Sequence, residues 1–87
     1  MKSIEEMIEY GIERGDVEFY IKEFPDIGGL CSGGCGENMI WYFCNRKDGD
    51  SIDSMGIYKS LRDLANAKVF DGKSLVDLFD VADFSMN

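Results

Sequence analysis

The sequence predicts an α+β fold in which a small antiparallel sheet of about three strands is covered by two or three helices, in the order α-β-β-α-β-α. One observation is that apolar residues recur at helical spacing in some segments and alternate with polar residues in others. A second is that the composition, 45% hydrophobic and 13% aromatic, is too apolar for a disordered chain. Because 87 residues leave room for one core, residues 1–87 are expected to form a single compact domain.

The first helix is expected over about residues 3 to 14. Ser3 followed by Glu6 has the spacing of a capping box, in which side chains bond to the free N–H groups at a helix N-terminus. Gly15 should end the helix because glycine adopts turn conformations at no steric cost. The residues that recur at helical spacing and should face inward are Ile4, Met7, Ile8, Gly11 and Ile12.

A strand and a glycine-rich loop should follow. Residues 17–22 alternate apolar with polar or amphipathic side chains, as a half-buried strand does, and Pro25 should stop this strand. Residues 26–37 contain five glycines, which disfavour both a helix and the interior of a sheet. We therefore expect a loop there that joins two antiparallel strands.

The next segment, residues 39–44, is an uninterrupted apolar and aromatic run and is predicted to be the central strand. Successive side chains of a strand point to opposite faces. One face would carry Met39, Trp41 and Phe43, and the other Ile40, Tyr42 and Cys44. Both faces then need cover, or one of them makes a contact with another molecule.

Two further segments complete the predicted fold. Asp53 can cap a second helix over about residues 54–66. The last segment should form a short strand at residues 69–70, a turn at Asp71–Gly72 and a short helix that opens at Ser74. A hairpin in this last segment is the alternative.

The charge balance limits what the protein can bind. Nine Lys and Arg residues stand against 17 Asp and Glu residues, a formal net charge of -8, so the chain repels nucleic-acid backbones. The absence of histidine excludes Ser-His-Asp and Cys-His nucleophiles and histidine-containing zinc sites. We therefore expect no direct nucleic-acid binding, no enzymatic activity and no cofactor.

Two groups of carboxylates are the candidate partner-binding residues. Those of the first helix recur at i, i+4 spacing beside its apolar stripe, and those near the C-terminus recur at every third residue. Carboxylates at intervals on a rigid scaffold can imitate the phosphates of a nucleic acid and occupy a channel lined by arginine and lysine. The candidates are Glu5, Glu6, Glu9, Glu13, Asp16, Asp77, Asp80 and Asp83.

These carboxylates favour a small acidic protein-binding protein, most concretely an inhibitor that presents them to the basic surface of a nucleic-acid-processing enzyme. In size and charge alone, the chain is similar to the small acidic proteins of mobile elements that block restriction or CRISPR nucleases. A simpler explanation of the same charge is that it keeps an aromatic-rich domain in solution.

Two alternative functions use other residues. If helices cover only one face of the 39–44 strand, Trp41 and Tyr42 can contact a second copy of the chain or another protein, as in a homodimerising or accessory module. A zinc protein would instead use Cys31, Cys35 and Cys44, with Glu37 as a fourth ligand. Because the cysteine spacing lacks the usual C-x2-C pairs, no metal is expected.

The sequence also bears on the compartment. Glu5 and Glu6 stand where a secretory signal would be apolar, and no stretch approaches the roughly 18 apolar residues of a membrane span. An odd number of cysteines, three, is unlike the paired frameworks of small secreted domains. We expect a cytoplasmic protein with reduced thiols and no membrane association.

Overall fold

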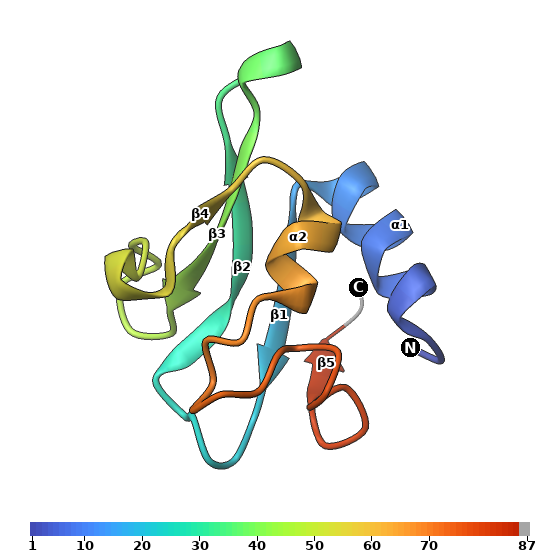
Figure 1. Ribbon diagram of the computed structural model, residues 1–87, viewed down its shortest axis with the longest axis vertical. Helices are drawn as coiled ribbons and strands as arrows, with labels where there is room; N and C mark the ends of the chain where they lie inside the picture. The colour runs from blue at the N-terminus through green and yellow to red at the C-terminus, as the bar shows by residue number, and fades with distance from the viewer. Residues whose placement is uncertain (86–87) are drawn as a thin grey trace.

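The computed structural model describes residues 1–85, which form one antiparallel sheet with the strand order β4-β3-β2-β1-β5 and two α-helices (Figure 1). The helices and strands are α1 (Ile4–Arg14), β1 (Asp16–Tyr20), β2 (Ile27–Gly33), β3 (Ile40–Asn45), β4 (Ile57–Tyr58), α2 (Leu61–Asn66) and β5 (Asp83–Ser85). Short 3-10 helices, η1 (Gly36–Asn38) and η2 (Asp53–Met55), lie in the connections. The class is α+β, but the expected number of about three strands and the expected order of elements are wrong. The sheet has five strands, and the helices and strands follow one another along the chain in the order α-β-β-β-β-α-β.

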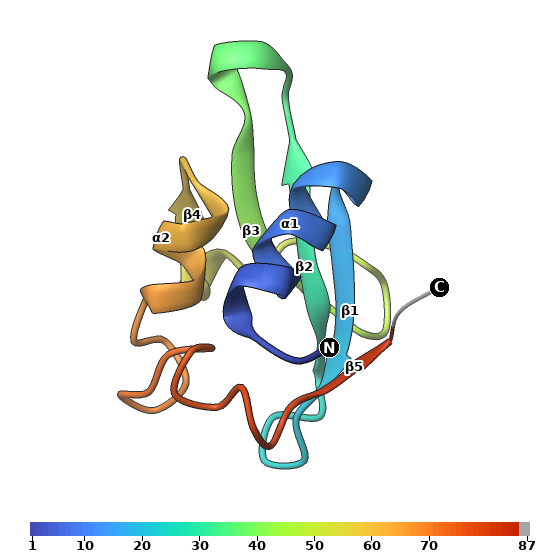
Figure 2. The same cartoon turned by 90° about the vertical axis from the view of Figure 1, so that its right-hand side faces the viewer.

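Both α-helices pack on the same face of this sheet (Figure 2). Val17, Leu30 and Phe43 lie opposite one another on β1, β2 and β3, and all three are buried. They share one apolar cluster with Met7 of α1 and Leu64 of α2. Successive residues of a strand point to opposite faces. The residues next to Val17, Leu30 and Phe43 along each strand therefore lie on the other face of the sheet, which no helix of the described chain covers. We call this the open face.

Helix α1 forms where the capping box predicted it. The Ser3 hydroxyl accepts the N–H of Glu6 at 3.1 Å, and Gly15 ends the helix with a φ of 86°. The buried stripe extends to Gly11, but Ile12, which was predicted to belong to it, is 61% exposed. One residue further along a helix is a rotation of about 100°, which turns Ile12 away from the sheet.

The predicted loop over residues 26–37 is wrong, because most of it is β2, the central strand. A Cβ atom added at Gly29 would collide with the carbonyl oxygen of Val17 on β1. A Cβ atom at Gly28 would lie 2.7 Å from the Cα atom of Arg46, just beyond β3. These glycines therefore allow neighbouring backbones to approach closely inside the sheet. The chain does not leave the sheet at these positions.

Strand β3 forms in the predicted 39–44 run, and it is an interior strand next to the centre of the sheet instead of the central one. The predicted alternation of faces is confirmed. Trp41 and Phe43 are buried toward the helices, whereas Ile40 and Tyr42 are half-buried on the open face. The β2–β3 hairpin continues beyond the rest of the sheet and carries η1 at its tip (Figures 1 and 2).

Helix α2 is much shorter than the helix predicted over residues 54–66. It begins at Leu61, and Ser60 caps it by accepting a backbone N–H of the first turn at 3.0 Å. The expected cap, Asp53, begins η2 instead. Gly56 explains the difference, because its φ of 90° ends η2 and directs the chain into β4.

At the C-terminus only the turn at Asp71–Gly72 agrees with the prediction, and the short strand before it is reduced to one bridge. The helix expected from Ser74 does not form. Residues 75–81 make successive turns, after which β5 pairs with β1. Phe84 accounts for this strand, since its ring lies 5.7 Å from that of Phe19 and anchors the extended chain beside β1.

Candidate functional site

Two of the candidate carboxylates on α1 have partners within the fold. Glu5 accepts two hydrogen bonds from the guanidinium of Arg62 on α2, at 2.9 and 2.7 Å. These bonds lower the pKa of the Glu5 carboxyl and join the two helices. Glu6 accepts the backbone N–H of Lys2 at 3.3 Å, which holds the start of the chain against the helix. Both side chains therefore form hydrogen bonds within the fold.

Asp77 has a similar structural role near the C-terminus. Its carboxylate accepts Lys68 Nζ at 2.7 Å and the backbone N–H of Ser74 at 2.9 Å. The Ser74 hydroxyl in turn accepts the N–H of Asp77 at 3.1 Å. The hydrogen bond from Lys68, followed by that from the Ser74 backbone, lowers the pKa of Asp77 to about 2. Asp77 thus organises the turns that precede β5.

The remaining five candidates are exposed, and none forms an ion pair with another residue of the described chain. They are Glu9, Glu13, Asp16, Asp80 and Asp83. Glu18 on β1, which is not among the eight candidate residues, is exposed in the same way. Its alternation with two buried residues of β1 is the signal that places it on the open face. We call these six carboxylates the acidic side.

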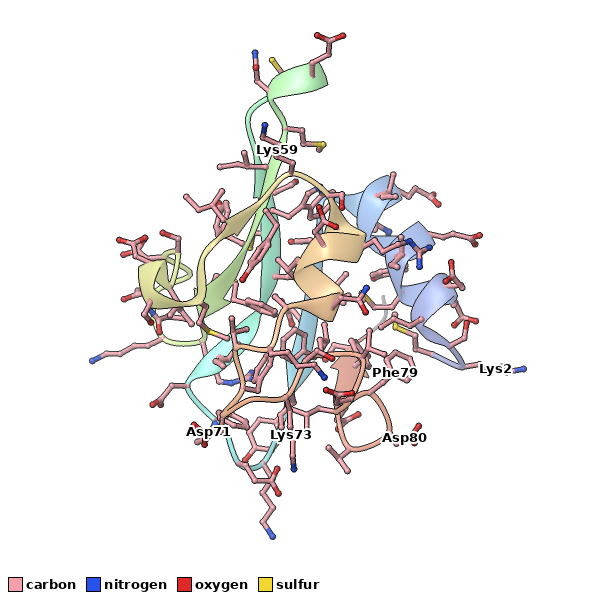
Figure 3. All side chains as sticks on the ribbon, viewed as in Figure 1. Lys2, Lys59, Asp71, Lys73, Phe79 and Asp80 are labelled. Atoms are coloured by element: carbon pink, nitrogen blue, oxygen red, sulfur yellow. The ribbon has the colours of Figure 1, made fainter. Side chains whose placement is uncertain are left out.

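The acidic side lies along the lateral edge of the sheet that β1 and β5 form. Helix α1 packs on β1, β5 pairs with β1, and Asp80 lies in the turns just before β5, so the segments that carry these residues are neighbours at the β1–β5 edge (Figure 2). Glu9 and Glu13 lie on the helix side of this edge, and Asp16 and Glu18 lie on the open face. A hollow there is lined by residues from both ends of the chain, including Lys2, Asp80 and Asp83. Figure 3 places Lys2 and Asp80 on the same side of the molecule as α1. Lys2 and Arg14 are cations on this side.

The open face carries apolar side chains at the opposite end of the sheet. Strand pairing aligns Asp16, Cys31, Tyr42 and Ile57 in one row across β1, β2, β3 and β4. Ile57 is 60% exposed, whereas Cys31 and Tyr42 are half-buried. The row therefore runs from a carboxylate of the acidic side to an exposed isoleucine on the edge strand. We call it the open-face row.

The prediction of a helix over residues 54–66 missed the exposed position of Ile57. Such a helix places Ile57 on its inner face, but the residue belongs to β4, which has only two residues. A strand this short has no detectable period in the sequence. Of the two aromatic candidates, Trp41 is 4% exposed and packs toward the helices, so Tyr42 is the one that lies in the open-face row.

A hollow of about 320 Å³ lies beside the open-face row, above the glycines of β2. Glu18 and Cys44 are among the residues that line it. Arg46 also borders the hollow, but its guanidinium donates hydrogen bonds to the carbonyl oxygens of Phe19 at 2.6 Å and Ile27 at 3.2 Å. These bonds hold Arg46 against the backbone of β1 and β2, and so they fix one wall of the hollow.

The three cysteines are free thiols and are not gathered at one point. The Sγ atoms of Cys31 and Cys44 are 3.2 Å apart, whereas Cys35 is exposed at the tip of the β2–β3 hairpin. Over residues 1–85, no group of three side chains is arranged to hold a metal ion. Burial and the hydrogen bond with Cys31 raise the pKa of the Cys44 thiol to about 12, so it is protonated at neutral pH.

No protein-family model, curated protein or solved structure matches this chain. Within the described residues, no helix is both long enough and apolar enough to cross a membrane. The acidic side and the open-face row are the two candidate contact surfaces described above.

Proposed function

We propose that this chain is a non-enzymatic protein-binding protein whose partner is a protein with a basic, nucleic-acid-binding surface. The observation that supports this most is that six exposed carboxylates lie along the β1–β5 edge of the sheet, on α1, on β1, on β5 and in the turns before β5. Such a patch favours an arginine- or lysine-lined partner and accelerates its association.

The contrast between two sets of carboxylates supports the proposal. Glu5 and Asp77 form ion pairs within the fold and so contribute to its local structure. The acidic side forms none with the described residues, and its like charges repel one another. Binding of a cationic partner would relieve that repulsion. These six side chains are therefore suited to contact another molecule.

The open-face row completes a typical interface. Protein interfaces combine an apolar centre with a polar rim. Tyr42 and Ile57 supply apolar surface on the open face, and Asp16 begins the acidic side at the other end of the same row. A protein partner with an apolar patch beside arginine or lysine matches both features.

The net charge distinguishes the partner from nucleic acid itself. At -8, the chain is repelled by a phosphate backbone. A basic protein surface that binds nucleic acid would accept these carboxylates in place of phosphates. We therefore expect the chain and nucleic acid to compete for one surface, as an inhibitor by mimicry does.

The test uses two variants with the same change in charge. Glu9→Lys, Glu13→Lys and Asp16→Lys reverse half of the acidic side, and Glu5 is left intact because of its bond to Arg62. The control combines Glu23→Lys, Asp26→Lys and Glu37→Lys, which are exposed and outside the acidic side. Three reversals add six charges, so both variants change the net charge from -8 to about -2.

The tagged wild-type chain is used to retain proteins from a lysate at low salt, and each retained protein is then purified. Its affinity for the wild type and for both variants is measured at several salt concentrations, with and without duplex DNA. We expect the acidic-side variant to bind at least tenfold more weakly than the control variant, and DNA to displace the wild type. Equal affinity of the two variants, or no competition by DNA, would contradict the proposal.

A second copy of the chain is the competing occupant of the open-face row. Light scattering of the purified protein gives its oligomeric state, and Ile57→Lys changes the exposed end of the row. A monomer agrees with the proposal. A dimer that Ile57→Lys dissolves would assign the open face to self-association and overturn it.

A further inference from the structure

Two thiols face each other on the open face of the sheet. Cys31 of β2 and Cys44 of β3 have their Sγ atoms 3.2 Å apart. Cys44 is 8% exposed, while Cys31 is half-buried, and both line the hollow of about 320 Å³ above the β2 glycines. A small reagent that enters this hollow therefore reaches Cys31 more easily than Cys44.

We propose that Cys31 and Cys44 form a reversible intramolecular disulfide, which makes this pair a redox-sensitive modification site. The proposal is independent of the protein-binding function, because it concerns only the chemistry of the two side chains. The third thiol, Cys35, lies at the exposed tip of the hairpin and is not part of this pair.

The sheet geometry favours this pairing. Cys31 lies opposite Tyr42, so Cys31 and Cys44 are diagonal neighbours across β2 and β3. Ideal diagonal neighbours are about 7–8 Å apart, beyond the Cα separation of most disulfides. Here the register shifts between Ile27 and Gly29, and such a bulge increases the local twist. From 3.2 Å, the sulfurs need to move about 1.1 Å to reach bonding distance.

A small disulfide, such as oxidised glutathione, supplies the oxidant. The Cys31 thiolate attacks one glutathione sulfur, which forms a mixed disulfide and expels one glutathione thiolate. Cys44 then loses its thiol proton and attacks the Cys31 sulfur, which expels the second glutathione as a thiolate. The two thiol protons pass to the expelled thiolates, so two protein thiols are oxidised and one glutathione disulfide is reduced. Burial and the bond with Cys31 raise the pKa of the Cys44 thiol, which leaves Cys31 as the first nucleophile.

The test follows thiols and mass in the full chain. The Cys35→Ser variant removes the exposed thiol and leaves the proposed pair. After incubation with oxidised glutathione, we expect this variant to lose both free thiols and the mass of two hydrogen atoms, with no added glutathione. Dithiothreitol should restore both thiols. Cleavage after Glu37 separates Cys44 from Cys31, so the two peptides should stay joined until they are reduced.

A matched control carries Cys31→Ser in addition to Cys35→Ser. It should gain at most one glutathione and form no internal bond. Urea unfolding provides a second measurement, because a cross-link between strands restricts the unfolded chain. The oxidised Cys35→Ser variant should unfold at higher urea than its reduced form, and the control should show no such shift. Two unreacted thiols, stable glutathione adducts on both cysteines, or disulfide-linked dimers in the Cys35→Ser variant would overturn the proposal.

Discussion

Replacing Gly29 by alanine tests whether the glycine-rich segment is the central strand of the sheet. The added Cβ atom would collide with the carbonyl oxygen of Val17 and lie 3.0 Å from the Cα atom of Glu18. Both are backbone atoms of β1, held in place by strand pairing and by the packed core beneath them. Overpacking costs about 1–3 kcal/mol, and we expect a value near 3 because backbone atoms cannot rotate out of the way.

Gly33→Ala is the matched control on the same strand. A Cβ atom at Gly33 would meet only the side chains of Tyr42 and Ile40, at 3.6 and 3.7 Å, which is ordinary contact. Alanine also restricts the unfolded chain. The free energy of unfolding should therefore rise by about 0.4–1 kcal/mol in this variant.

Urea unfolding followed by tryptophan fluorescence measures both variants. The chain has one tryptophan, Trp41, which is 4% exposed and reports on the core. With a slope of about 1–3 kcal/mol per molar urea, a loss of about 3 kcal/mol lowers the midpoint by roughly 1–3 M. If Gly29→Ala unfolds at the same urea concentration as Gly33→Ala, the backbone of β2 does not lie against that of β1 at Gly29.

Two further predictions concern the C-terminal turns and the core. The folded pKa of Asp77, about 2, lies below the ordinary aspartate value of 3.8, so its stabilisation is complete above pH 3.8 and is lost as the pH falls toward 2. The urea midpoint of Asp77→Asn should therefore depend less on pH in this window than that of the wild type, and parallel curves would contradict the assignment. Phe43 is fully buried against Phe19 and Phe70, so Phe43→Ala should lower the free energy of unfolding by about 3–5 kcal/mol. A loss below about 1 kcal/mol, measured by the same urea titration, would place Phe43 outside the core.

Local signals in the sequence were sufficient for some elements. Ser3 and Gly15 define the ends of α1 because the hydroxyl cap and the left-handed glycine act within a few residues. The alternation along β3 separates Trp41 from Tyr42, since the two faces of a strand follow from its geometry alone. The turn at Asp71–Gly72 is equally local.

Other elements depend on contacts between distant parts of the chain. The glycines of β2 disfavour a strand on propensity, yet Gly28 and Gly29 are required where neighbouring backbones come too close for a side chain. Strand β5 exists because β1 offers a free edge and Phe84 packs against Phe19. Neither condition can be inferred from the residues of the segment itself.

The functional surfaces divide in the same way. The negative charge, the absence of histidine and the candidate carboxylates follow from composition and spacing alone. The ion pairs of Glu5 and Asp77 within the fold, and the position of Asp16 and Asp83 on adjacent strands at one edge of the sheet, depend on the tertiary structure. It also brought Cys31 and Cys44 to 3.2 Å. Strand pairing sets which distant side chains become neighbours, and that pairing depends on the burial of the whole core.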